Sequence, residues 1–163
     1  MFKKVSAIGL LLLATTQART GPAPPDSPDK VASLWQMPDL SFGLYSGMIP
    51  ITGTQKSLHY VAALSQKDWS KDPVIVWFNG GPGCSSMLGW TQEHGPYVVE
   101  DGTTKFTKNT YSWNKEATVI YFDSPAGVGF SVCGDQAECN FDDDNSADDN
   151  LAAIISLMTT KFT

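Results

Sequence analysis

The sequence predicts an α/β fold built as a sandwich, with helices packed on a sheet of buried strands. Residues 73–78 and 117–123 read PVIVWF and ATVIYFD, and such apolar runs are typical of strands covered on both faces. A long helix is predicted over 142–162, where an acidic start precedes apolar positions at helical spacing. Buried strands alternating with helices are typical of α/β architectures.

An antiparallel hairpin is predicted before the buried strands. Regular structure is expected from about Leu34 onward. Aromatic and β-branched residues dominate 41–51 and 57–65, and Gly and Thr mark a turn at 52–54. The hairpin therefore supplies two more strands to the sheet.

Two helices are predicted to pack beside these strands. The segment 85–95 is short and ends at a Gly-Pro pair. The longer helix is expected to be capped by Asp144 or Asn145, with acidic residues at the positive end of its dipole. Four apolar residues fall on one face of the longer helix: Leu151, Ile154, Ile155 and Met158.

The first 33 residues precede the predicted domain, which occupies 34–163. Two lysines lead into an apolar run that ends near a small residue, Ala18, and this order is typical of a secretory signal peptide over 1–18. The Pro-rich segment 19–33 predicts an extended leader. The chain is thus expected to enter the secretory pathway, towards a lysosome, a vacuole or the extracellular space.

The charge balance argues against a nucleic-acid partner. The chain has 11 basic and 17 acidic residues, a net charge of −6. Cleavage of the signal peptide removes two lysines, leaves nine basic residues against the seventeen acidic ones, and brings the charge to −8. Nucleic acids select for Lys and Arg.

No other segment is long and apolar enough to span a membrane, so none is expected to contact one after cleavage.

Three cysteines can be interpreted in light of this export prediction. Cys133 and Cys139 flank a short polar loop, and a disulfide between them is expected in an oxidising compartment. Cys84 is then left over, as a reactive thiol or as half of a bond to a partner outside these residues. The chain lacks the close Cys and His pairings of structural zinc sites, so no metal or other cofactor is expected.

The loop that follows the first buried strand has the composition of an anion-binding site. Gly80, Gly81 and Gly83 carry no Cβ, so a ligand can approach the backbone N–H groups closely. Such groups bind a phosphate, a carboxylate or an oxyanion. A P-loop pattern is absent, which disfavours phosphate. A tight turn without a ligand is the plainer alternative.

Several motifs together resemble the serine carboxypeptidase family. The string WFNGGPGCSSMLGWTQEHGPY is similar to the family's N-G-G-P-G-C-S-S…E-x-G-P signature, and VIYFDSPAGVGFS to its D-x-P-x-G-x-G-F-S loop. The hairpin and the long helix agree in order and spacing. The resemblance covers residues 34–163 and implies an incomplete, three-layer fold of the α/β-hydrolase type, with removal of C-terminal residues from peptides through an acyl-enzyme.

The resemblance also implies roles for particular residues. Gly81 would supply an oxyanion-hole N–H, while Asn79 and the N–H of Gly80 would bind the C-terminal carboxylate of a peptide or protein substrate. Glu93 would share a proton with a glutamate next to the nucleophile, which favours binding at acidic pH. Trp77 either orients the site or belongs to the core.

The same resemblance suggests a partner for Cys84, whereas the role of Asp123 is inferred from its place in the chain. Cys84 matches a family cysteine whose disulfide partner lies far downstream. Asp123, directly after the second buried strand, is expected to fix the following loop rather than act as an acid.

The family's catalytic triad is not found in these residues. No G-x-S-x-G nucleophile elbow occurs, and His59 and His94 both lie too early for the order Ser…Asp…His. We therefore interpret the chain as the N-terminal part of such an enzyme. Two alternatives remain: a non-catalytic secreted homologue that binds carboxylates, and a family acyltransferase.

We expect the 163-residue chain by itself to be inactive and poorly soluble, because its buried strands require further neighbours. Expressed alone, it should aggregate or bind hydrophobic dyes, and a serine-directed phosphonate probe should not label it. A monomeric, cooperatively unfolding product with peptidase activity would contradict this prediction.

Overall fold

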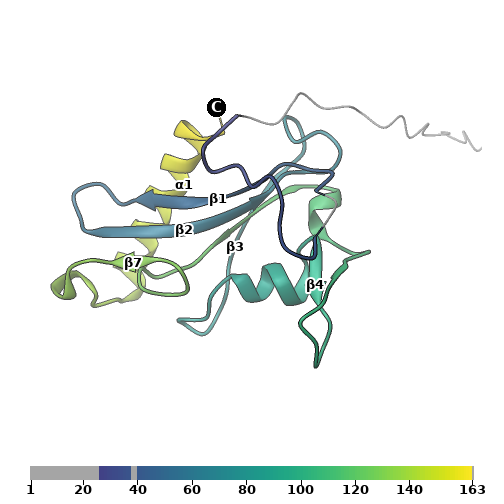
Figure 1. Cartoon of the computed structure of the whole chain (residues 1–163). Helices are drawn as coiled ribbons and strands as arrows, with labels where there is room; N and C mark the ends of the chain where they lie inside the picture. The colour runs from purple at the N-terminus through teal and green to yellow at the C-terminus, as the bar shows by residue number, and fades with distance from the viewer. Residues whose placement is uncertain (1–25, 38–39, 163) are drawn as a thin grey trace, which may run out of the picture.

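A five-stranded mixed sheet forms the centre of the computed structural model, which describes residues 26–37 and 40–162 (Figure 1). The order is β1-β2-β6-β3, and β7 pairs with the start of β2. The strands are β1 Leu44–Pro50, β2 Lys56–Ala63, β3 Val74–Phe78, β6 Thr118–Phe122 and β7 Val132–Cys133. The predicted signal peptide, 1–18, lies outside the described residues. The described part of the predicted leader runs beside β1, where Lys30 pairs with Tyr45.

The predicted hairpin is confirmed. β1 and β2 pair in antiparallel register from Leu44 opposite Ala63 to Pro50 opposite Ser57. The turn between them contains Gly53 at a φ of 82°, a conformation that glycine adopts readily. The hairpin contributes buried side chains to both faces of the sheet.

The second predicted buried strand is also confirmed, as β6. It lies between β2, to which it is antiparallel, and β3, to which it is parallel. All five residues of β6 are buried. Its side chains alternate between two cores, with Ile120 and Phe122 on one face and Val119 and Tyr121 on the other. The sheet therefore supports a layer on each side.

The first predicted buried strand is present as β3, with Val76 and Phe78 packed against one core and Ile75 and Trp77 against the other. Within the described residues β3 pairs only with β6 and lies at the edge of the sheet. Val74 is 43% exposed, and the other four residues are half-buried. An apolar run indicates that a strand has apolar surface to bury, but it does not determine its place in the order of strands.

Two layers cover the sheet. Helix α1, Asp143–Thr160, lies across one face, where Ala153 and Leu157 are fully buried. The opposite face is covered by the segment before β1 and by the region that contains Trp90 and Tyr97. The three-layer arrangement predicted from the sequence is thus present, with few helices and an incomplete sheet.

Short elements fill the region between β3 and β6. The predicted helix over 85–95 is realised as a five-residue π-helix, η1 Gly89–Glu93. A small hairpin of β4 Tyr97–Val99 and β5 Phe106–Lys108 follows, and then a single 3₁₀ turn, η2 Trp113–Lys115. Another 3₁₀ turn, η3 Gln136–Glu138, precedes α1. The last four elements are not predicted from the sequence, because three residues give too short a pattern.

Helix α1 begins and packs differently from the prediction. Asp142, not Asp144 or Asn145, is its N-cap, and its carboxylate accepts a hydrogen bond from the N–H of Asn145. The Asn145 side chain accepts from the Asp142 N–H in return, which completes a capping box.

The predicted apolar face of α1 is not the packed face. Leu151, Ile155 and Met158 are exposed, and of the four predicted residues only Ile154 packs against the core. The buried residues of α1 are instead Asp149, Ala153 and Leu157, which recur every fourth position.

A buried ion pair explains which face of α1 is packed. The ammonium of Lys56 in β2 lies 2.6 Å from Oδ2 of Asp149, and both side chains are 9% exposed. The small side chain of Ala153 lets the helix approach the sheet closely. The ion pair therefore fixes the rotation of α1 about its own axis. It does so even though the face of α1 that points away from the sheet is the more apolar one.

The predicted disulfide between Cys133 and Cys139 is present, and Cys84 is a free, exposed thiol.

Among the described residues, no helix combines the length and apolar character that crossing a bilayer requires.

Replacing Lys56 by Met should lower the free energy of unfolding by about 3–5 kcal/mol, because it leaves the Asp149 carboxylate buried without its partner. Urea denaturation measures this. The matched control is Lys67→Met, which breaks the exposed pair with Glu116 and should cost at most about 1 kcal/mol. Equal losses in the two variants would show that burial of the pair does not matter.

The packed face of α1 can be checked with two leucines. Leu157→Ala should cost about 2–5 kcal/mol of unfolding free energy, because the side chain is fully buried. Leu151→Ala, at a position that is 56% exposed, should change it by about 0.5 kcal/mol or less. The reverse order would mean that α1 packs through the face predicted from the sequence.

Candidate functional site

Two loops meet at one edge of the sheet. β3 and β6 are parallel and end together, with Phe78 opposite Phe122. The NGGPG loop, residues 79–86, follows β3, and the SPAGVGF loop, residues 124–131, follows β6. In open α/β sheets ligands bind beyond the carboxyl ends of the strands. The two Gly-rich segments of the sequence therefore lie at the place where this architecture forms its sites.

Asp123, the first residue after β6, connects the two loops. Its carboxylate is fully buried. Oδ1 accepts hydrogen bonds from the Ser85 hydroxyl at 2.6 Å and from the Ser86 N–H at 2.9 Å, and Oδ2 accepts from the Phe130 N–H at 3.0 Å. The carboxylate thus fixes the NGGPG loop on one side and the SPAGVGF loop on the other, as expected for a residue that supports a loop.

The same hydrogen bonds determine the charge state of Asp123. Burial alone would raise the pKa of its carboxyl group. Hydrogen bonds from His59, Ser85 and the backbone N–H of Phe130 favour the ionised form more strongly, so the pKa lies below its ordinary value. Asp123 is therefore a buried anion satisfied by its own donors.

Ser86 forms a second connection between the strands. Its hydroxyl is fully buried, donates to the carbonyl oxygen of Phe122, and accepts from the N–H of Asn79 at 3.0 Å. The hydroxyl therefore links the ends of β6 and β3. It also fixes the position of Asn79, the residue with which the NGGPG loop begins.

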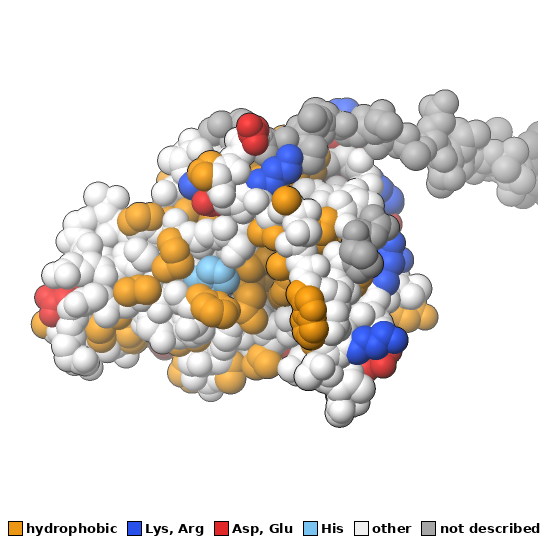
Figure 2. Space-filling view, in the orientation of Figure 1, with side chains coloured by type: hydrophobic (Ala, Val, Ile, Leu, Met, Phe, Trp, Pro, Cys, Tyr) orange, Lys and Arg blue, Asp and Glu red, His pale blue; other side chains and the backbone are white. Residues whose placement is uncertain are grey.

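His59 extends the network from Asp123 into the hairpin. Its Nδ1 lies 3.0 Å from Asp123 Oδ2, and its Nε2 lies 3.0 Å from the hydroxyl oxygen of Ser46. The order Ser–His–Asp is that of a hydrolase triad. Asp123, however, already serves both loops, so we interpret this arrangement as support for the loops. Phe130 packs edge-on against His59, and both line a hollow of about 350 Å³; Figure 2 shows a histidine among hydrophobic side chains on this face.

The Asn79 side chain is held by Trp77. The indole N–H of Trp77 donates to Asn79 Oδ1 at 3.1 Å, and an indole can only donate, so this contact assigns the orientation of the amide. Within the described residues the NH₂ group of Asn79 forms no hydrogen bond, which leaves two donors for a ligand. Gly89 in η1 makes room for the indole, because a Cβ there would lie 2.6 Å from Trp77 Nε1.

The tip of the NGGPG loop is exposed from Gly80 to Cys84. Gly81 has a φ of 145°, which disfavours any residue with a side chain. A Cβ at Gly81 would also lie 3.1 Å from the backbone nitrogens of Gly83 and Cys84. The backbone N–H groups of this tip are thus gathered where a negatively charged ligand can reach them.

Glu93 lies at the end of η1 with its side chain half exposed. No direct hydrogen bond joins it to Asn79 or Gly80 in the described part of the chain. His94, the next residue, lies between the two groups: its Nε2 is 3.9 Å from Glu93 Oε2, and its ring is 4.4 Å from that of Trp77. The structure thus gathers Trp77, Asn79 and the glycines in one place and connects Glu93 to them through a histidine.

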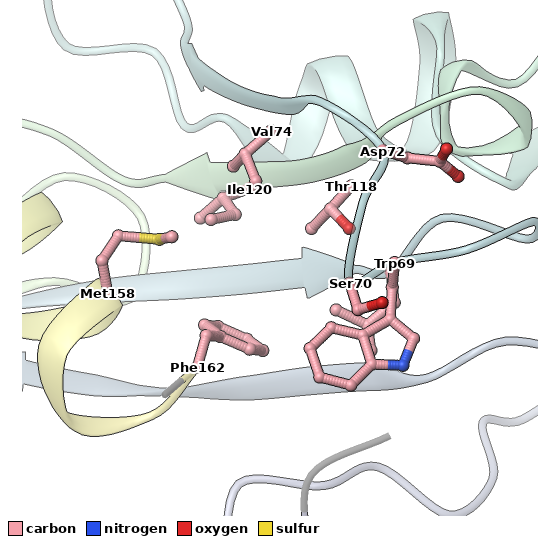
Figure 3. Close-up of a pocket in the computed structure, with 9 residues that line it drawn as sticks. Trp69, Ser70, Asp72, Val74, Thr118, Ile120, Met158 and Phe162 are labelled. Atoms are coloured by element: carbon pink, nitrogen blue, oxygen red, sulfur yellow. The ribbon is translucent and has the colours of Figure 1, made fainter. Parts of the chain in front are cut away.

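The hollow in Figure 3 belongs to a different part of the molecule. It has a volume of about 360 Å³ and is lined mainly by apolar side chains, among them Trp69, Met158 and Phe162. Val74 and Thr118, the first residues of β3 and β6, also line it. This hollow therefore lies at the amino ends of the strands, away from the two loops.

The described residues contain no group of three His, Cys, Asp or Glu side chains that could hold a metal ion. The chemistry that the site offers comes instead from backbone N–H groups, the Asn79 amide and the Glu93 carboxyl. These groups suit recognition of a carboxylate and of an oxyanion.

Comparison with known proteins agrees with this arrangement. The family model described as serine carboxypeptidase matches residues 35–162. The chain belongs to the serine carboxypeptidase family. It is 39% identical over 151 residues to lysosomal protective protein from Mus musculus, covering 92% of this chain and 31% of that protein. It is 41% identical over 112 residues to serine carboxypeptidase 1 from Hordeum vulgare, covering 65% of this chain and 22% of that protein.

A solved serine carboxypeptidase shares the fold. The structure of Kex1(Δ)p, a prohormone-processing carboxypeptidase from Saccharomyces cerevisiae, superposes with a TM-score of 0.64 at 26% identity. The match covers 80% of this chain and 32% of that one. The fold is therefore of the α/β-hydrolase type, and the chain spans a third or less of the length of these relatives.

Several residues that support the site are not predicted from the sequence. The motif that contains Ser85 and Ser86 does not reveal their supporting hydrogen bonds, and no pattern assigns a role to Gly89 or His94. Gly89 in LGW and the polar His94 five residues later were the available signals, but their meaning depends on Trp77, which precedes them in a different element.

Replacing Asp123 by Asn should lower the free energy of unfolding at pH 7 by about 2–4 kcal/mol, because an amide presents donors to donors. The folded pKa is lowered, so the ionised carboxyl stabilises the fold above its ordinary pKa of 3.8 and this contribution is lost as the pH falls. The difference between variant and wild type should therefore shrink below about pH 4. Urea denaturation across pH measures it, with the exposed Asp101→Asn as control; a pH-independent difference would contradict the account.

Proposed function

We propose that this chain supplies the carboxylate-recognition and oxyanion-binding parts of a serine-type carboxypeptidase that releases C-terminal residues from peptides and proteins. The observation that carries the proposal is the hydrogen bond from Trp77 to Asn79 Oδ1. It turns the NH₂ group of Asn79 away from the indole, beside an exposed turn of backbone N–H groups. A terminal carboxylate accepts hydrogen bonds from this combination of donors.

Substrate binding begins with the peptide's C-terminus. The Asn79 amide and the Gly80 N–H donate to the two carboxylate oxygens. Charge-assisted bonds of this kind contribute about 1.5–3 kcal/mol each. An amidated C-terminus carries no charge, so the site selects free chain ends, as an exopeptidase must.

The acyl-transfer step uses the same loop. As a nucleophile attacks the carbonyl of the last peptide bond, negative charge develops on its oxygen. The Gly81 N–H donates to this oxyanion and stabilises the transition state more than the substrate. Expulsion of the C-terminal residue leaves an acyl-enzyme, which water hydrolyses. The nucleophile, its histidine and its aspartate are not among these 163 residues.

Glu93 contributes to the same site. As the resemblance to the family implies, its carboxyl group hydrogen-bonds a second glutamate beside the substrate carboxylate.

The proposal includes the organisation of the chain: a signal peptide over 1–18, a leader over 19–33 and the enzyme's N-terminal part over 34–163. It also includes a disulfide from Cys84 to a cysteine elsewhere. The secretory pathway is the proposed location, and the word lysosomal in the name of the mouse relative supports it. The disulfide between Cys133 and Cys139 agrees with an oxidising compartment.

The test uses the full-length gene product that carries these residues, with two peptides that differ only in a free or amidated C-terminus. Wild type should release the last residue from the free acid and act poorly on the amide. Asn79→Ala should raise KM for the free acid about 10- to 100-fold with little change in kcat, because it removes binding common to substrate and transition state. Calorimetry with a non-hydrolysable free-acid peptide measures affinity separately.

The control is Asn140→Ala, an exposed asparagine before α1, which should leave KM unchanged. Peptide binding without turnover would point instead to a non-catalytic carboxylate-binding protein. Transfer of an acyl group to an alcohol in place of water would point to an acyltransferase. Absence of both turnover and binding would overturn the proposal.

A further inference from the structure

His94 presents an unexplained buried polar atom. The residue is 6% exposed, and within the described residues its Nε2 has no hydrogen-bond partner. A buried polar group that has lost its contacts with water and has found no partner destabilises the fold. Such an atom in a native structure needs an explanation in terms of function or of a partner that moves into place.

The position of the His94 ring is fixed by three aromatic side chains. Trp113 stacks on it at 4.0 Å with an interplanar angle of 14°, and Tyr121 lies parallel to it at 5.5 Å. Trp77 meets it edge-on at 4.4 Å. The imidazole therefore cannot move far, and Trp77, which orients Asn79, rests directly against it.

The neighbours of the ring favour one of its two neutral tautomers. Burial lowers the pKa of His94, although the nearby Glu93 opposes this shift. The Tyr121 hydroxyl, 3.1 Å from Nδ1, can donate or accept, whereas the Glu93 carboxyl oxygen, 3.9 Å from Nε2, favours a donor there. We therefore assign the hydrogen to Nε2, with Nδ1 accepting from Tyr121.

Glu93 is the acceptor within reach of that donor. Its Oε2 lies 3.9 Å from His94 Nε2, and its side chain is half exposed and free to change rotamer. A shift of about 1 Å brings the pair to hydrogen-bond distance. The Glu93 side chain, half exposed, can make this adjustment when a substrate carboxylate occupies the site.

We propose that His94 is a positioning residue for carboxylate recognition: its Nε2–H holds the Glu93 carboxyl, while its ring holds Trp77 and through it the Asn79 amide. The inference rests on the proposed function. It explains how Glu93 is held in position relative to Asn79, although the two residues have no direct contact within the described part of the chain. Without the Nε2–H donor, Glu93 is free to rotate away from the substrate.

Two variants of the full-length protein separate this role from simple packing. The amide NH₂ of His94→Gln reaches the place of Nε2, whereas that of His94→Asn falls nearer Nδ1. Both remove the ring and create similar packing losses. We expect KM for the free-acid peptide to rise in both variants, because both lose the ring that rests against Trp77, and to rise about tenfold more in the Asn variant than in the Gln variant, which keeps the donor. KM for the amidated peptide should change equally in both.

Trp113→Phe is the packing control. It weakens the stack on His94 but keeps the Nε2–H donor, so it should lower the melting temperature without a selective change in KM for the free acid. Equal KM values for the Asn and Gln variants, or a rise that is the same for free-acid and amidated peptides, would overturn the inference.

The outcomes separate this inference from the function it rests on. A wild-type protein that neither cleaves nor binds the free-acid peptide overturns the proposed function. Normal activity of the wild type with unchanged selectivity in His94→Asn overturns only the role of His94. If the wild type binds without turnover, the same comparison is made with dissociation constants from calorimetry, and equal constants for the two variants overturn the inference.

Discussion

The buried carboxylate of Asp123 is the interaction on which the site depends. It lies at the end of the most buried strand, and its four hydrogen bonds reach the loop after β3, the loop after β6 and the hairpin. A charge in this position is costly unless every lone pair is used. Because the donors come from three separate segments, all three must be in place for the charge to be satisfied, and this fixes the conformation of the NGGPG loop.

A second level of support comes from the aromatic side chains on the opposite side of the NGGPG loop. Trp77, His94, Trp113 and Tyr121 form one cluster through ring contacts between 4.0 and 5.8 Å. Large rings in contact have few alternative packings, so polar groups attached to them are placed precisely. The glycine at position 89 lets this cluster approach η1 closely. An exposed loop that binds a small charged group needs rigid support of this kind from neighbouring side chains.

Much of this arrangement follows from the sequence, and the rest depends on contacts between distant segments. Strand identity, the hairpin and the short disulfide are local properties and were predicted correctly. The composition of β3 does not show on which side its neighbour lies, because an apolar strand has the same composition whether one or two strands flank it. The face of α1 was wrong: Leu151 belongs to the more apolar face, but the pairing of Asp149 with a lysine of β2 decides which face is buried. The place of His94 beside Trp77 likewise arises only when η1 folds over β3.

The parallel pairing of β3 with β6 also determines when the site forms during folding. The hairpin joins neighbouring segments across a short turn, whereas this pairing places Val74 opposite Thr118 and must first close the long intervening segment. Both loops extend from these two strands, so they meet only after that step. The edge of the sheet that carries both loops is therefore assembled after the hairpin, so the backbone N–H groups of 79–86 reach their final arrangement late in folding.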